Sequence, residues 1–262
     1  MAKKSLGQHF LGNPKILQRI IESAQLDADD LVVEIGPGPG SLTKMLLKKV
    51  RKVIAIELDE QLFERLKTEL AGYDNIELVQ GDALKYPYEE LPAFKVVANI
   101  PYYITTPIIF RLLEMGLKTP SIRQSGKNLK SITLTIQKEV AERIVARPGG
   151  KDYGVLSIMV QYYAQPSFEF IIPKESFRPV PKVDSAVIRL IILEKPSVEV
   201  KDEKLFFTII RTAFSQRRKM LSNSLKSVRE DVREWLDKAG IDPKRRPETL
   251  SVEEFARLAD IL

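Results

Sequence analysis

The chain has 262 residues, 44% of them hydrophobic, and a formal net charge of +6 at pH 7, which suits a soluble globular protein with a polyanionic partner. The absence of cysteine excludes disulfides and thiolate metal sites, and a single histidine argues against a histidine-ligated metal or a histidine-based triad. No apolar run reaches the roughly 18 residues of a membrane helix, and the basic N-terminus lacks the apolar stretch of a signal peptide. We therefore expect a monomeric cytoplasmic protein with no metal and no membrane contact.

The first predicted helix covers residues 14–25, where apolar side chains recur at helical spacing after Asn13 as the N-cap and Pro14 in the first turn. Apolar runs then alternate with amphipathic segments. Strands are predicted at 31–35, 53–57, 76–80, 95–99 and 131–137, and helices at 41–50, 60–71 and 106–117. Short apolar strands separated by helices predict a mostly parallel sheet covered on both faces, a Rossmann-like α/β fold.

Two later strands, near 167–172 and 184–193, are separated mainly by loop, which predicts an antiparallel pair at the edge of the sheet. A polar stretch containing Pro196 then ends the strand pattern. Only helical periodicity follows, at roughly 203–215, 217–227, 229–239 and 251–262. We expect two domains, residues 1–195 with an N-terminal arm and a small all-helical domain of residues 196–262.

A glycine-rich loop, Gly36-Pro37-Gly38-Pro39-Gly40, follows the first strand and precedes a helix. Glycines there allow a sharp turn and let a ligand approach the bare backbone. The spacing differs from the dinucleotide pattern G-x-G-x-x-G because Ser41 replaces the last glycine, and no Walker sequence follows. Taken alone, the loop also fits a tight turn that binds nothing.

Carboxylates follow the next two strands. Glu57 ends the second strand, where such folds place an acceptor for ribose hydroxyls, and Asp82 follows the third. Each alone also fits a solvated carboxylate or a turn residue. Because the carboxyl ends of parallel strands meet at one edge, the glycine loop and both carboxylates together predict a ligand crevice. A nucleoside with a short charged tail and no diphosphate, S-adenosylmethionine, fits it best.

The fourth strand delivers Asn99, Ile100, Pro101 and Tyr102 to the same edge. The Asn99 side-chain oxygen and the Ile100 carbonyl can accept the two N–H bonds of an adenine amine and aim its lone pair at a methyl carbon. Pro101 adds rigidity and leaves the Ile100 carbonyl exposed, while Tyr102 offers a flat surface for the base. The segment predicts amine methylation; the alternative is a turn capped by Asn99 beside core tyrosines.

Several stretches spread over nearly the whole chain carry a family resemblance. They are "KKSLGQHFL", "VVEIGPGPGSLT", "VIAIELD", "GDAL", "NIPYYITTPI", "QKEVAERI", "YGVLSIMVQYY", "FRPVPKVDSAVIRL" and "FSQRRKMLSNSL". The chain closely resembles the small-subunit ribosomal RNA adenine dimethyltransferases and, more distantly, the large-subunit enzymes of macrolide resistance. The resemblance implies transfer of methyl groups from S-adenosylmethionine to N6 of two adjacent adenosines in a hairpin near the 3′ end of small-subunit rRNA. It also implies a late role in small-subunit biogenesis.

The resemblance also assigns site residues by position. The implied cofactor-binding residues are His9, Leu11, Gly36, Gly38, Glu57, Asp82 and Asn99. Phe177 corresponds to a second aromatic that sandwiches the target base opposite Tyr102, although composition alone favours a core residue there. Many family members have Asn at position 9, so a packing histidine remains the alternative for His9.

Basic residues supply the expected contacts to the small ribosomal subunit or its precursor rRNA. They are Lys4, Arg178, Arg217, Arg218 and Lys219. Contacts to phosphates position RNA without reading sequence, and they weaken with salt. The triplet 217–219 is predicted to begin a helix, and a merely solvated charged face is its alternative. The basic connection at 120–131 is longer than the family pattern; we expect it opposite the crevice, with no part in catalysis.

Three rival functions stay open. The first is resistance-type methylation of large-subunit RNA, and the second is a non-catalytic RNA-binding assembly or transcription factor with this fold. The third is DNA adenine-N6 methylation, because NIPYY resembles the N-P-P-Y clamp of those enzymes. The stretches at 177–190 and 214–225 favour the small-subunit type, and Glu57, Asp82 and NIPYY together argue against a pure binding protein.

Overall fold

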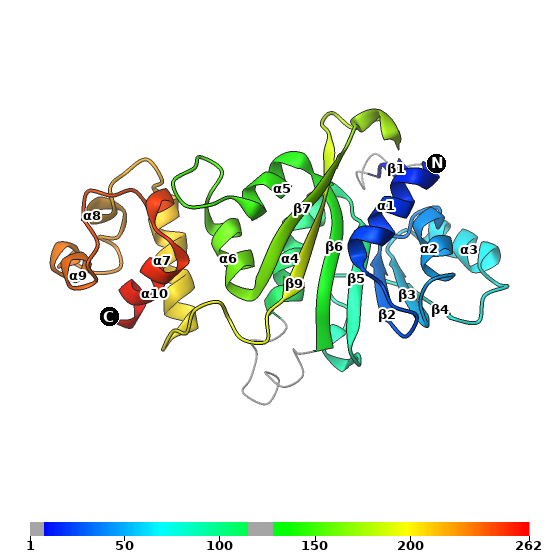
Figure 1. Ribbon diagram of the computed structural model, residues 1–262, viewed down its shortest axis with the longest axis horizontal. Coiled ribbons are helices and arrows are strands. Elements are labelled where there is room, and N and C mark those ends of the chain that lie inside the picture. Colours follow the sequence, from blue (N-terminus) through cyan, green and yellow to red (C-terminus); the bar gives the residue numbers. More distant parts are fainter. Residues whose placement is uncertain (1–7, 115–127, 262) are drawn as a thin grey trace. The chain divides into compact units, whose positions relative to one another are not determined.

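The computed structural model describes residues 8–114 and 128–261 of the chain (Figure 1). Lys4 and most of the basic connection at 120–131 lie outside these described residues. Two compact units are formed. The first comprises the described residues up to Ala141 together with Ser167–Ile192, and the second comprises Glu142–Pro166 together with the residues from Leu193 onward.

The unit boundary near residue 193 lies beside the expected boundary at 195. The segment 142–166 differs from the expectation, because it packs within the second unit although the sequence placed it in the first domain. It contains helix α6, Val155–Tyr163, whose Tyr162 ring lies 5.1 Å from the ring of Phe206. Apolar side chains of this helix therefore join the C-terminal core, a long-range contact that periodicity does not reveal.

The first unit is built on a seven-stranded sheet of order β4-β3-β2-β5-β6-β9-β7 (Figure 1). Its strands are β2 Leu31–Ile35, β3 Lys52–Glu57, β4 Ile76–Gln80, β5 Phe94–Asn99, β6 Leu129–Gln137, β7 Ala164–Ile172 and β9 Ser185–Ile192. Strands β2 to β6 pair in parallel, and β9 pairs antiparallel with β6, with Gln137 opposite Ser185. The predicted mostly parallel sheet with an antiparallel strand toward one edge is confirmed.

Helices of the first unit follow the strands in the predicted alternation. They are α1 Pro14–Ala24, α2 Ser41–Leu46, α3 Glu60–Glu69, α4 Thr105–Leu113 and, across the unit boundary, α5 Lys138–Val145. Asn13 caps α1 as expected, because its side chain accepts a bond from the Lys15 amide (3.0 Å). Helix α1 buries one face, on which Leu17 and Ile20 pack into the core cluster that also contains Val32.

A short two-stranded ribbon was not predicted. Strand β1, Phe10–Leu11, pairs antiparallel with β8, Phe177–Arg178, so that Leu11 lies opposite Phe177. Strands this short leave no periodic pattern in the sequence. The ribbon fastens the arm preceding α1 to a segment far along the chain.

The second unit is helical apart from the start of β7. Its helices are α6, α7 Glu203–Ser215, α8 Leu221–Ser224, α9 Val232–Lys238 and α10 Val252–Asp260. Trp235 is buried in its core, with the indole Nε1 donating to the Leu258 carbonyl (2.9 Å). Within the described ranges, no helix combines the length and apolarity that crossing a membrane requires.

The basic triplet Arg217-Arg218-Lys219 does not begin a helix, which corrects the prediction. The Lys219 amide donates to the Gln216 carbonyl (2.8 Å), which closes a turn after α7. Met220 is then extended, and α8 starts only at Leu221. Three adjacent cations are therefore spread along a turn.

Gly40 provides a test of the strand-to-helix turn. Its φ is +78°, and a Cβ there would lie 2.8 Å from Leu66 Cδ2. We expect Gly40→Ala to lower the free energy of unfolding by about 1–2 kcal/mol or more, because L-residues disfavour left-handed backbone and the added methyl group has no space. Urea denaturation measures the change.

The matched control is Gly72→Ala, because a Cβ at Gly72 would meet nothing within 4 Å. Its free energy of unfolding should stay within about 0.5 kcal/mol of the wild type. Equal losses in the two variants would contradict the account of this turn.

Candidate functional site

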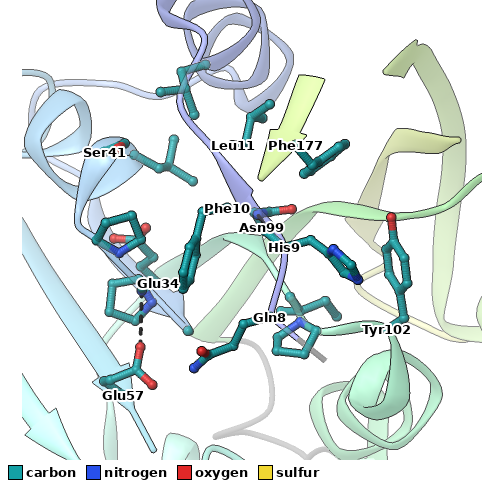
Figure 2. A pocket seen from close by; sticks show the side chains of 18 residues that line it. Gln8, His9, Phe10, Leu11, Glu34, Ser41, Glu57, Asn99, Tyr102 and Phe177 are labelled. Carbon is teal, nitrogen blue, oxygen red and sulfur yellow. Dashed lines mark hydrogen bonds between the residues drawn. The ribbon is translucent and has the colours of Figure 1, made fainter. Parts of the chain in front are cut away.

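A pocket lies at the carboxyl ends of β2, β3 and β5, with about 670 Å³ of space including the part open to solvent (Figure 2). Its walls are formed by residues 8–11 of the arm, the glycine loop at 36–39, Glu57, the segment 99–102 and Phe177. All of them belong to the first unit. The structure thus brings together the predicted catalytic residues and, except for Asp82, all of the predicted cofactor-binding residues.

Asp82 does not line this pocket but lies at the neighbouring strand end. The Gly81 amide donates to the Glu57 carbonyl (2.9 Å), which places the start of the loop after β4 beside the end of β3. Burial, and then the charges of Asp82 and Glu57, raise the pKa of Tyr103. Tyr103 and Leu58 are both about half exposed. Beyond the pocket, the same sheet edge therefore presents apolar surface next to a carboxylate.

The glycine loop is shaped by left-handed backbone and by Glu57. Gly36 and Gly38 have φ values of +66° and +58°, and a Cβ on Gly38 would lie 2.9 Å from the Phe10 ring. The Glu57 carboxylate accepts from the amides of Gly38 (3.1 Å) and Asp59 (2.9 Å), as Figure 2 shows for the first of these. Both positions favour glycine because of their left-handed backbone, and at Gly38 a side chain would also collide with the Phe10 ring.

Glu57 is 4% exposed, and burial raises its pKa while the two amide bonds oppose that rise. A carboxylate has about four acceptor positions, so its two bonds to amides leave capacity for further donors. The environment of Glu57 is compatible with the predicted contact to ribose hydroxyls.

Glu34 is a pocket residue that sequence reasoning missed. It lies in β2, is 1% exposed, and its Oε2 has no hydrogen-bond partner in the described part of the chain. Burial raises its pKa from 4.5 to about 8. The available signal was a carboxylate inside the apolar run "LVVEI". A buried carboxyl group in the pocket wall with one oxygen lacking a hydrogen bond suits a ligand that brings a cation.

Asn99 is oriented by the arm. Its Nδ2 donates to the His9 carbonyl (3.2 Å), which leaves Oδ1 as an acceptor. The His9 ring stacks on Tyr102 with centroids 5.7 Å apart, and its Nδ1 donates to the Pro179 carbonyl (2.7 Å). In Figure 2 the imidazole stands beside the phenol ring. His9 thus lines the pocket and covers part of the aromatic surface that the sequence assigned to a base.

Tyr102 and Phe177 differ in their surroundings. The Tyr102 hydroxyl bonds to Ser185 Oγ (2.7 Å), a partner that no sequence pattern indicated, and burial raises the pKa of Tyr102. Phe177 lines the pocket but is 0% exposed and belongs to the hydrophobic core cluster. Phe177 is therefore packed as the core residue that composition alone favours.

The expected RNA contacts fall in both units. Arg178 is exposed at the surface, and its guanidinium donates to the carbonyls of Glu175 (2.8 Å) and Phe177 (2.9 Å). Arg218 and Lys219 are exposed in the second unit, where Arg217 donates to the Gly150 carbonyl (3.3 Å). In the portion of the chain that the structure describes, no three His, Asp or Glu side chains form a metal-binding group.

A family model described as "Ribosomal RNA adenine dimethylase" matches residues 1–262. The chain is 49% identical to ribosomal RNA small subunit methyltransferase A of Clostridium acetobutylicum, over 98% of this chain and 92% of the relative. It is 50% identical to the protein of the same name from Clostridium perfringens, over 99% and 90%.

Two solved structures resemble the chain over nearly their whole length. A dimethyladenosine transferase from Plasmodium falciparum has a TM-score of 0.76 and 31% identity, over 95% of this chain and 96% of that one. The 23S rRNA methyltransferase ErmE has a TM-score of 0.72 and 32% identity, over 97% and 99%. The predicted fold class, a Rossmann-like methyltransferase sheet, is confirmed.

Glu34 gives the site a pH signature. The folded state retains a proton on Glu34 that the unfolded chain releases near pH 4.5, so the wild type loses stability as pH rises from about 5 to about 8. Glu34→Gln cannot ionise and lacks this loss, while Glu57, the neighbouring carboxylate, is present in both proteins. Across that window we expect the unfolding free energy of the variant to rise relative to that of the wild type by on the order of 3–4 kcal/mol.

Urea titrations of both proteins at pH 5, 6, 7 and 8 measure this difference. Unfolding free energies that run parallel across the series would contradict the assignment of a buried, protonated Glu34.

Proposed function

Because the chain belongs to the ribosomal RNA adenine dimethylase family, we propose that its pocket directs methyl transfer to N6 of two adjacent adenosines in a hairpin near the 3′ end of small-subunit rRNA. Family membership confirms the sequence-based prediction of an S-adenosylmethionine-dependent rRNA adenine dimethyltransferase. The Clostridium relatives, named for the small subunit and about half identical over nearly all of the chain, support that choice of target.

One observation carries the residue assignments: Asn99 lies in the same pocket as the glycine loop and Glu57. In this proposal Glu57 accepts hydrogen bonds from the ribose hydroxyls, and Asp82 at the next strand end binds the adenine amine. Glu34, ionised on binding, pairs with the ammonium of the methionine tail beside Gly36 and Gly38. When bound, the sulfonium supplies an electrophilic methyl group.

Asn99 and Ile100 orient the nucleophile. The Nδ2 bond to the arm fixes the amide of Asn99 with its oxygen free to accept one N6–H, and the Ile100 carbonyl accepts the other. The side chain of Ile100 is buried, so its peptide group is the part that serves the site. Held in this way, the N6 lone pair forms the N–C bond as the S–C bond breaks, and the amine then loses a proton to solvent. Orientation of the reacting pair supplies the rate.

Tyr102 provides the stacking surface for the target base. His9 rests on that ring in the structure, so the proposal requires the imidazole to move aside when an adenine enters. Phe177, being fully buried, forms the wall opposite and holds the arm through its pairing with Leu11. Pro101 contributes a fixed φ between the strand and this aromatic.

Phosphate contacts complete the proposal. Arg178 and the triplet Arg217-Arg218-Lys219, with Lys4 from the arm, bind the rRNA of the small subunit or its precursor. A cytoplasmic location is part of this proposal, since the bacterial relatives are named for ribosomal RNA methylation. Monomeric behaviour is proposed from the sequence analysis alone. The likeness to the 23S rRNA methyltransferase favours a second candidate, methylation of large-subunit RNA by the same residues.

A labelled-methyl assay separates the candidates. Purified protein is supplied with methyl-labelled S-adenosylmethionine and, in parallel, unmethylated small subunits, naked small-subunit RNA and large-subunit RNA. We expect N6,N6-dimethyladenosine in small-subunit RNA only. Label confined to large-subunit RNA would replace the first function by the second, and absence of label with intact subunit binding would leave a non-catalytic assembly factor.

The role of Asn99 in orienting the target amine is tested by Asn99→Ala. Loss of the Oδ1 acceptor should reduce transfer about 100-fold or more, because the amine is no longer aimed at the methyl carbon. Binding to small subunits, measured by co-sedimentation, should stay close to the wild type. Equal turnover by both proteins would remove Asn99 from the mechanism.

A further inference from the structure

Arg111, on α4, reaches the loop that follows β4. Its Nε donates to the Leu84 carbonyl (3.3 Å) and its Nη2 to the Tyr86 carbonyl (3.1 Å). The guanidinium also forms a two-point ion pair with Glu89, with Nη1–Oε1 at 2.6 Å and Nη2–Oε2 at 2.9 Å. One planar side chain therefore holds this loop at several points along its length.

The contact is partly shielded from water. The side chains of Arg111 and Glu89 are 20% and 25% exposed, and the hydrogen bonds that the guanidinium donates to Glu89 raise the pKa of Arg111. The Arg111 Cζ lies 5.6 Å from the centre of the Tyr88 ring, which is fully buried. A two-point pair with this degree of burial has a more defined geometry than an exposed ion pair.

Asp82 is connected to Arg111 through a single residue. The Asp82 carboxylate accepts from the Leu84 amide (2.9 Å), and the Asp82 carbonyl accepts from the Lys85 amide (2.9 Å). Leu84 thus orients the carboxylate with its N–H while its carbonyl is held by Arg111. A shift of Leu84 would move the Asp82 carboxylate with it.

The other end of this connection is the catalytic segment. Helix α4 follows directly after the turn Tyr102–Ile104, which is closed by the bond from the Ile104 amide to the Pro101 carbonyl (3.2 Å). Arg111 therefore ties the loop of Asp82 to α4, the helix that directly follows the segment of Asn99 and Tyr102. The pairing of neighbouring strands alone does not provide this link, because β4 and β5 are separated in the sheet by β3 and β2.

We propose that Arg111 is a positioning residue that fixes Asp82 relative to Asn99. The nucleoside of the cofactor is thereby bound at the position that methyl transfer beside Asn99 requires. The inference rests on the proposed function, in which Asp82 binds the adenine of the cofactor. Lysine cannot replace Arg111, because a point charge cannot bond two carbonyls and a carboxylate in one plane.

The test compares Arg111→Lys with a matched control. Arg245 forms the same kind of two-point pair with Glu254 and donates to the Thr249 carbonyl (2.6 Å), but it belongs to the second unit and does not line the pocket. Calorimetric titration with S-adenosylhomocysteine should show roughly three- to tenfold weaker binding for Arg111→Lys, in the range for residues of one hydrogen-bond network. Arg245→Lys should bind as the wild type does.

A double-mutant cycle with Asp82→Asn tests whether Arg111 affects cofactor binding through Asp82. If Arg111 acts through Asp82, Arg111→Lys should change the affinity little in the Asp82→Asn background. The same fold-change in both backgrounds, or wild-type affinity of Arg111→Lys, would overturn the inference alone. Wild-type affinity of Asp82→Asn would overturn the assignment of Asp82 in the proposed function as well.

Folding is checked by circular dichroism before each titration. If Arg111→Lys does not fold, Glu89→Gln replaces it in the cycle, since that variant weakens the ion pair but keeps the bonds to Leu84 and Tyr86. Its affinity should fall in the wild-type background and change little in the Asp82→Asn background. Equal changes in both backgrounds would again contradict the inference.

Discussion

The bond from the Gly38 amide to the Glu57 carboxylate joins the ends of two neighbouring parallel strands, and the arrangement of the site depends on it (3.1 Å). It holds the glycine loop against β3 in a left-handed conformation that leaves space for the Phe10 ring. Phe10 belongs to the arm, and the arm also accepts, through the His9 carbonyl, the hydrogen bond that Asn99 Nδ2 donates. The glycine loop, Glu57 and Asn99 are therefore parts of one hydrogen-bonded and packed assembly.

Sequence reasoning succeeded where one local rule determines the structure. Apolar runs of five or six residues between amphipathic segments predicted β2 to β5, and Asn13 before Pro14 predicted the start of α1. The pocket followed from a single topological fact, that parallel strands end at the same edge. Glu57 and Asn99 are the last residues of their strands, so their meeting required no tertiary information.

What the sequence did not reveal depends on contacts between distant segments or on burial. The β1–β8 ribbon pairs two dipeptides, and the stacking of His9 on Tyr102 follows from that pairing. Glu34 was overlooked because its chemical interest comes from burial, which raises its pKa to about 8, and not from its spacing. Arg111 gave no motif at all, since its partners are mainly backbone carbonyls in another loop. Such contacts are apparent only once the chain is folded.

The most direct measurement is calorimetric titration of S-adenosylhomocysteine into the wild type and into Glu57→Gln. The account predicts one site per chain in the wild type and at least about tenfold weaker binding in the variant, because an amide replaces the acceptor of the ribose hydroxyls and loosens Gly38. Circular dichroism establishes that both proteins are folded. Equal affinities in two folded proteins would contradict the placement of the cofactor at the Gly38–Glu57 bond, and with it the account of the site.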